Sequence, residues 1–150
     1  MGIFNKKRAR QNITLVQKSE QQMTLADLVN ACIELVHDDK KVYVIDGRGG
    51  KCAMKNGYEI FEFHPYKSAG CNFYHLSLRG GISSYDIKEA RDGIYACDGQ
   101  EVACAKLEEL YNICENNRQE YVKVLKARRE AEKQESLNAD VMLIKSYLGR

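Results

Sequence analysis

The dipeptide Asn56-Gly57 places the strongest constraint on how this chain folds. It separates two short runs, 51–55 and 58–64, that are typical of β-strands. A two-residue hairpin loop of type I′ needs positive φ at both central positions, which Asn and Gly adopt more readily than other residues. The dipeptide therefore predicts an antiparallel hairpin in which Lys55 lies opposite Tyr58.

Extending this hairpin without interruption pairs Ala53 with Ile60 and Lys51 with Glu62. Side chains alternate between the two faces of a strand, so the register also predicts which residues are buried. The residues expected on the buried face are Cys52, Met54, Phe61 and Phe63.

Two more strand-like runs flank the hairpin, at 42–46 and 71–79. With the hairpin they predict a four-stranded antiparallel β-meander over residues 41–79. In the last strand Tyr74, Leu76 and Leu78 form the more apolar face. The opposite face of that strand is predicted to carry Cys71, Phe73, His75 and Ser77.

Helical periodicity appears on both sides of the meander. Thr24 and Asp27 resemble a capping box, and apolar residues at helical spacing predict an amphipathic helix over about 24–37. Residues 83–93 predict a short helix that begins at Ser83 or Ser84 and ends at Gly93. An apolar stripe predicts a longer helix over about 99–135, capped by Asp98, and a short amphipathic helix follows at 137–150.

These elements predict an α+β fold in one compact domain. Its parts are a basic N-terminal arm at 1–23 with a short strand at 12–17, a core at 24–98 and a helical region at 99–150. A helix over 99–135 would be roughly 55 Å long at about 1.5 Å per residue, more than a compact domain of this size covers. The C-terminal helix is therefore predicted to form a homo-oligomer or to dock on a protein partner.

Composition narrows the function classes. The formal net charge is only +2, so any surface for polyanions must be local, and the cluster Lys6, Lys7, Arg8 and Arg10 is the obvious one. Six cysteines without a signal-peptide pattern predict reduced thiols in a cytoplasmic protein. No apolar run is long enough to predict a membrane span.

The glycine-rich segment 47–50 does not match a P-loop, because Cys52 follows Lys51 and the next element is a strand. It predicts a loop between strands. Cations and aromatic rings nearby still allow a nucleotide or nucleic-acid site on one sheet face, which Glu62 on that face disfavours. The residues predicted for binding are Arg48, Lys51, Lys55, Tyr58, Phe73 and His75.

His64, Cys71 and His75 form the only dense group of nucleophilic or metal-binding residue types. They lack the paired spacing of zinc sites, so neither a metal nor a cofactor is assigned. A hydrolase using Cys71, a histidine base and Glu62 is the third hypothesis. The first is a non-catalytic binding protein that acts as inhibitor or adaptor through protein–protein contacts, with no catalytic residue assigned.

Overall fold

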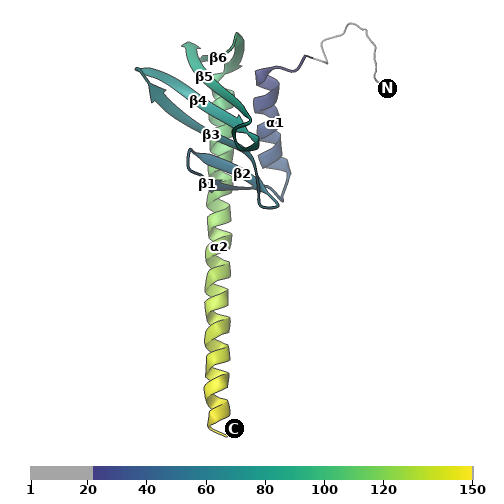
Figure 1. Cartoon of the computed structure of the whole chain (residues 1–150), viewed down its shortest axis with the longest axis vertical. Helices are drawn as coiled ribbons and strands as arrows, with labels where there is room; N and C mark the ends of the chain where they lie inside the picture. The colour runs from purple at the N-terminus through teal and green to yellow at the C-terminus, as the bar shows by residue number, and fades with distance from the viewer. Residues whose placement is uncertain (1–21, 150) are drawn as a thin grey trace, which may run out of the picture.

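A computed structural model describes residues 22–149 of the chain. The predicted basic arm and its strand at 12–17 lie outside the described residues. The predicted α+β fold with an antiparallel sheet is confirmed, and the described residues form two α-helices (Figure 1). The sheet has seven strands in sequential order, so the prediction of four strands was wrong.

The strands are short except in the centre of the sheet. They are β1 (Tyr43–Asp46), β2 (Lys51–Lys55), β3 (Tyr58–Ser68), β4 (Cys71–Leu78), β5 (Ser83–Arg91), β6 (Ile94–Cys97) and β7 (Gln100–Ala103). The helices are α1 (Leu25–Asp38), α2 (Cys104–Tyr147) and the 3-10 turn η2 (Arg79–Gly81) between β4 and β5.

The capping box of α1 is confirmed. The Thr24 hydroxyl accepts a hydrogen bond from the Asp27 N–H at 3.1 Å, and the Asp27 carboxylate accepts one from the Thr24 N–H at 2.9 Å. The Leu25 N–H, left free by the helix geometry, donates to the Gln100 side chain at 3.0 Å. This last bond ties the start of α1 to β7 at the far edge of the sheet.

The segment predicted as a helix at 83–93 is strand β5 and its following turn. Its residues alternate, with Tyr85 and Ile87 packed in the core and Ser84 and Asp86 exposed. That period of two suits a strand covered on one face. The serines and the glycine that suggested helix ends instead flank a strand, and Gly93 occupies the β5–β6 turn with a φ of 75°.

The hairpin at Asn56-Gly57 is confirmed, with Lys55 opposite Tyr58. Beyond it the register shifts between Ala53 and Met54, because β3 contains one extra residue. Ala53 therefore pairs with Phe61 instead of Ile60, and Lys51 pairs with Phe63 instead of Glu62. A shift of one residue reverses the faces, so Cys52 shares its face with Glu62, and Ala53 takes the predicted core position.

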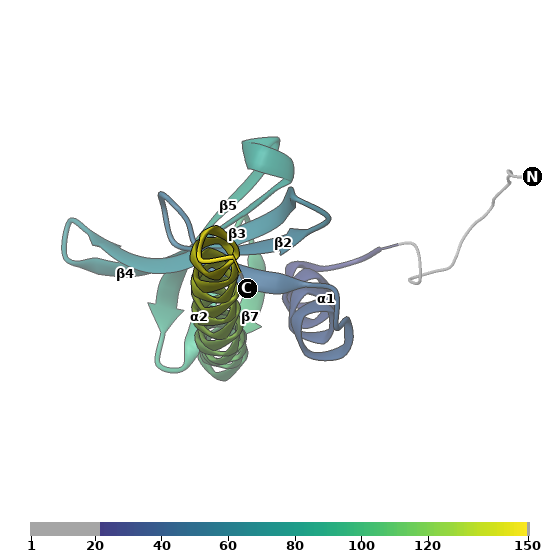
Figure 2. The same cartoon turned by 90° about the horizontal axis from the view of Figure 1, so that it is seen from below.

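Both helices lie on the same face of the sheet (Figure 2). We call this the helix face and the opposite one the outer face. The core forms where α1 and the first part of α2 cover the strands. Its fully buried side chains are Val29, Val44, Phe61, Phe63, Leu76, Ile87, Val102, Leu107, Leu110 and Cys114.

Helix α2 differs from the prediction at both ends. It begins at Cys104, because Asp98 and Gly99 have positive φ in the turn between β6 and β7 and do not cap a helix. It also continues without interruption to Tyr147, so the separate terminal helix predicted at 137–150 is its last part. The strands β6 and β7 pair over residues that the prediction had assigned to a loop and a helix start.

Candidate functional site

The glycine-rich loop between β1 and β2 is shaped by packing. A Cβ atom on Gly47 would lie 2.2 Å from the Cys52 Sγ, and one on Gly50 would lie 2.4 Å from the His64 Cβ. Both distances are too short for real contacts, so only glycine lets the loop lie this close to the outer face. The Gly49 N–H donates to the Glu62 carboxylate at 2.9 Å, which places an acidic group where a phosphate would need donors.

Helix α2 leaves the sheet about halfway along its length (Figure 1). Its first part is buried through Leu107, Leu110 and Cys114, and Tyr121 makes the last large contact by stacking on Tyr43 with ring centroids 4.5 Å apart. Every residue from 126 to 147 is exposed. That stretch is about 33 Å long at about 1.5 Å per residue. Its backbone is helical, but nothing in the described domain covers it.

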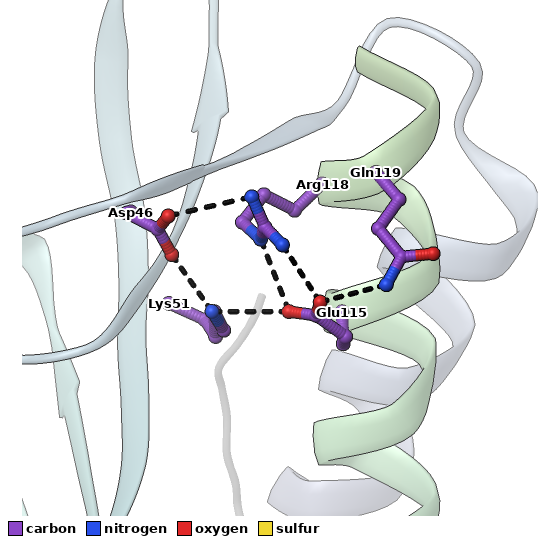
Figure 3. A network of polar contacts seen from close by, with 5 residues as sticks. All are labelled: Asp46, Lys51, Glu115, Arg118 and Gln119. Atoms are coloured by element: carbon purple, nitrogen blue, oxygen red, sulfur yellow. Dashed lines mark hydrogen bonds and ion pairs between the residues drawn. The ribbon is translucent and has the colours of Figure 1, made fainter. Parts of the chain in front are cut away.

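A polar network fixes α2 to the sheet near the point where it departs (Figure 3). Lys51 on β2 lies between two carboxylates, 2.7 Å from Asp46 and 3.0 Å from Glu115. Arg118 makes two bonds to Glu115, at 3.0 and 2.7 Å, and lies 3.4 Å from Asp46. Two cations and two anions therefore balance one another, and Gln119 adds a bond to Glu115 at 2.9 Å. The network links α2 to β1 and β2.

The Glu115 carboxylate is the centre of this network. Hydrogen bonds from Arg118, Gln119 and Lys51 hold its pKa well below the usual range of a glutamate. A depressed pKa contributes stability that is present above the unfolded-state pKa of about 4.3 and is lost as the pH falls toward the folded-state value.

We expect Glu115→Gln to lower the free energy of unfolding at pH 7 by about 1 kcal/mol, because it removes a charge from a partly exposed network. The same variant should lose less stability than the unmodified protein when the pH falls from about 5 to about 2. Urea unfolding at several pH values measures both effects. Glu120→Gln is the matched control, because Glu120 pairs only with exposed Lys123. Parallel pH curves for all three proteins would contradict the prediction.

The end of α2 carries large exposed apolar side chains. Their exposed fractions range from 43% at Val141 to 78% at Tyr147. Four consecutive residues, 141–144, are all apolar, and at about 100° per residue they point to every side of the helix. We call the following set the apolar tip: Leu137, Val141, Met142, Leu143, Ile144 and Tyr147.

The six predicted binding residues do not share one surface. Lys51 and Lys55 lie on the helix face, where Lys51 pairs with Asp46 and Glu115 and Lys55 pairs with Asp39 at 2.5 Å. Arg48 is exposed in the loop, and Tyr58 is 77% exposed at the hairpin end. The extra residue in β3 places Lys51 and Lys55 on the face opposite to Phe73 and His75, and sequence periodicity alone cannot reveal such a shift.

Phe73 and His75 lie on the outer face, in a row of rings along β3 and β4. Tyr66 stacks on Phe73 with ring centroids 4.9 Å apart, and His64 lies 5.4 Å from His75. The Lys88 ammonium lies 5.9 Å from the centroid of the Phe73 ring. Burial, followed by the proximity of His75, lowers the pKa of His64 below its usual value, which favours the neutral ring.

His75 also contacts two residues of β5 that the sequence prediction did not include. Its Nδ1 lies 2.8 Å from the Asp86 carboxylate, and its Nε2 lies 3.5 Å from the Ser84 hydroxyl. Tyr66 donates a second hydrogen bond to the same Asp86 oxygen at 2.9 Å. The sequence signal was the serine and aspartate two residues apart, which point to one face only if the segment is a strand.

Cys71 is not part of this group. It lies at the start of β4 opposite Ser68, and its Sγ lies 3.9 Å from the Ala69 carbonyl oxygen. His75 is four residues further along the strand, about 13 Å away at about 3.3 Å per residue. The predicted arrangement of Cys71 with a histidine base and Glu62 is therefore not formed.

One group in the described residues has the spacing to hold a metal ion. The Cys52 Sγ and carboxylate oxygens of Glu59 and Glu62 all lie within 4.8 Å of one another on the outer face. Burial, and then the two carboxylates, raise the pKa of the Cys52 thiol to about 12. The thiol is therefore protonated at neutral pH, unless a cation replaces its proton.

The six cysteines are all free thiols. Burial raises the pKa of Cys32 and of Cys114 to about 12, and both lie in the core between the helices and the sheet. Both thiols are buried, so Cys32 and Cys114 act as core residues that are not reactive.

Comparison of the chain with protein-family models, with curated proteins and with solved structures finds no match in any of the three. Within residues 22–149, neither helix is long and apolar enough to cross a membrane.

Proposed function

We propose that this chain is a small binding protein, an inhibitor or adaptor, that self-associates through the projecting part of α2. The observation that carries the proposal is the apolar tip, which lies on a part of α2, residues 126–147, that no other described element covers. Exposed apolar groups of this size on one element are typical of protein interaction sites.

The distribution of residues along α2 supports protein contact at its end. Residues 126–136 are mostly charged and separate the globular domain from the apolar tip. Within the tip, Leu137, Val141 and Ile144 follow the 4-3 spacing of a coiled-coil seam. Asp140 and Lys145 flank that seam, so helices of two copies can pair charges beside it. A reducing compartment such as the cytoplasm suits six free thiols.

The alternative of nucleotide or nucleic-acid binding is a weaker hypothesis. Lys51 and Lys55 are neutralised by carboxylates of the fold, which leaves Arg48 as the exposed cation of the predicted set. A polyanion surface needs several uncompensated cations close together.

We expect the full chain to be oligomeric at micromolar concentration, and the double variant Val141→Asp, Ile144→Asp to be monomeric. Two carboxylates within an apolar seam cannot be buried without a large cost in free energy. Light scattering coupled to size-exclusion chromatography measures the mass. Gln134→Asp, Ser136→Asp is the matched control, because it adds the same charge to the same helix outside the apolar tip.

A second variant separates association from folding. A chain that ends at residue 126 lacks the projecting part of α2 and keeps every core residue, so it should be a folded monomer. A monodisperse monomer for the unmodified chain, or an unchanged mass in both variants, would contradict self-association through this surface.

A further inference from the structure

Strands β4 and β5 bring three side chains together on the outer face, at a distance from the apolar tip. His75 and Asp86 are directly opposite each other in the register, and Ser84 is two residues before Asp86 on the same face. Side chains at opposite positions of neighbouring strands lie close enough to interact. The contacts follow from this placement, with His75 bonded to Asp86 at 2.8 Å and to Ser84 at 3.5 Å.

The hydrogen bond to Asp86 determines which nitrogen of the His75 ring carries the proton. An ionised carboxylate only accepts hydrogen bonds, so Nδ1 of His75 carries the proton that is donated to Asp86. In the neutral ring, Nε2 then has a free lone pair, and the Ser84 hydroxyl is its neighbour. The order nucleophile, base and orienting carboxylate is the order that activates a serine hydroxyl.

The carboxylate is itself held in place. Tyr66 donates to the same Asp86 oxygen at 2.9 Å, so two donors from two strands orient it. These bonds, the one from His75 first, also lower the pKa of Asp86, which keeps the carboxylate ionised. The His75 side chain is 25% exposed and Ser84 is exposed, so a reagent reaches both from solvent.

We propose that Ser84, His75 and Asp86 form a nucleophilic site that accepts acyl groups from small activated esters. Ser84 Oγ attacks the carbonyl carbon while Nε2 of His75 takes the hydroxyl proton, and a new Oγ–C bond forms. The ester C–O bond then breaks, and the leaving alcohol takes that proton from His75. Water next attacks the acyl carbon while Nε2 of His75 takes one of its protons. The Oγ–C bond then breaks, His75 returns that proton to Ser84 Oγ, and a carboxylic acid is released.

The outer face is open, which limits the substrates. A substrate on a flat sheet face makes few contacts, so little binding energy is available to expel a poor leaving group. Esters of good leaving groups fit this site, whereas peptide amides do not. Asp86 is a positioning residue here, because it acts only through His75.

The test uses the full chain and a small fluorophosphonate reagent, with the labelled residue located by mass spectrometry. Attack by Ser84 breaks the P–F bond, fluoride leaves, and His75 takes the hydroxyl proton. We expect stoichiometric labelling of Ser84, none in Ser84→Ala, and labelling about 100-fold slower in His75→Gln, which lacks the base. Ser83→Ala and His37→Gln are matched controls that should label at the unmodified rate, because the Ser83 side chain bonds Arg79 and His37 bonds Asp38 on α1.

Two further measurements distinguish activation of Ser84 by His75 from a purely structural role of His75. Added imidazole should restore labelling of Ser84 in His75→Ala, which repair of the fold would not explain. Asp86→Asn should remove the preference of His75 for a proton on Nδ1, seen in nitrogen-15 spectra, and should slow labelling. Labelling of Ser84 no faster than that of Ser83, or an unchanged rate in folded His75→Gln, would overturn the proposal.

Discussion

Replacing Lys51 by glutamate should lower the free energy of unfolding by about 3–5 kcal/mol, because a carboxylate would take the place of a largely buried ammonium group that pairs with two carboxylates. The Lys51 side chain is only 14% exposed and lies between Asp46 and Glu115. The substitution would bring three carboxylates together, with Arg118 as the remaining cation. Urea unfolding at pH 7 measures the loss.

Lys55→Glu is the matched control for this prediction. Lys55 also pairs with a carboxylate on the helix face, but its side chain is 36% exposed and it has one acidic partner, Asp39. It should lose much less stability, on the order of 1 kcal/mol. Equal losses in the two variants would show that the network around Lys51 does not hold α2 to the sheet.

This difference matters for any binding test. If the Lys51→Glu variant fails to bind a ligand, unfolding of the protein would explain the loss as well as a missing contact would. Arg48 is exposed in the loop between β1 and β2, so Arg48→Glu tests the basic surface without disturbing the network.

A second large loss of stability is expected from a substitution on the helix face of the sheet, compared with the same substitution on the outer face. Phe63→Ala should cost about 3–5 kcal/mol, because Phe63 is fully buried and stacks on Tyr74 with ring centroids 5.3 Å apart. Phe73→Ala should cost about 1 kcal/mol, because that ring lies on the partly exposed outer face and stacks on Tyr66. Thermal and urea unfolding of the two variants compare the same chemical change on opposite faces. Similar losses would mean that the outer face is packed as tightly as the core.

Local signals in the sequence predicted the elements that depend on nearby residues. The capping box at Thr24 and the turn at Asn56-Gly57 each use residues within four positions of one another, and both are confirmed. The core stripe of α2 was also predicted, because a long helix repeats its pattern often enough to be recognised.

The sequence predictions were wrong where the face or the type of an element depends on a single residue or on a strand distant in the sequence. One additional residue in β3 reverses the face of Lys51, and no composition signal marks it. Residues 83–93 contain helix-type ends and charged residues, yet pairing with β4 makes them a strand. Tertiary pairing outweighed local preference there.

The two candidate sites, the apolar tip and the group around His75, also differ in whether the sequence could predict them. The exposed end of α2 could be predicted from its apolar residues and its length. The contacts of His75 with Ser84 and Asp86 could not, because they require β5 to be a strand in a particular register. Predicting β5 correctly would have placed all three residues on one face.

The sequential strand order has a consequence for how the chain reaches this structure. Each strand pairs only with its neighbour in the sequence, so the sheet can grow one hairpin at a time with short loops to close. The distant contacts join α1 to β7 and join α2 to α1, β1 and β2, such as the Leu25 bond to Gln100 and the ion pair of Lys51 with Glu115. We infer that a nascent chain forms most of its sheet before α2 has been synthesised, and that α2 completes the core last.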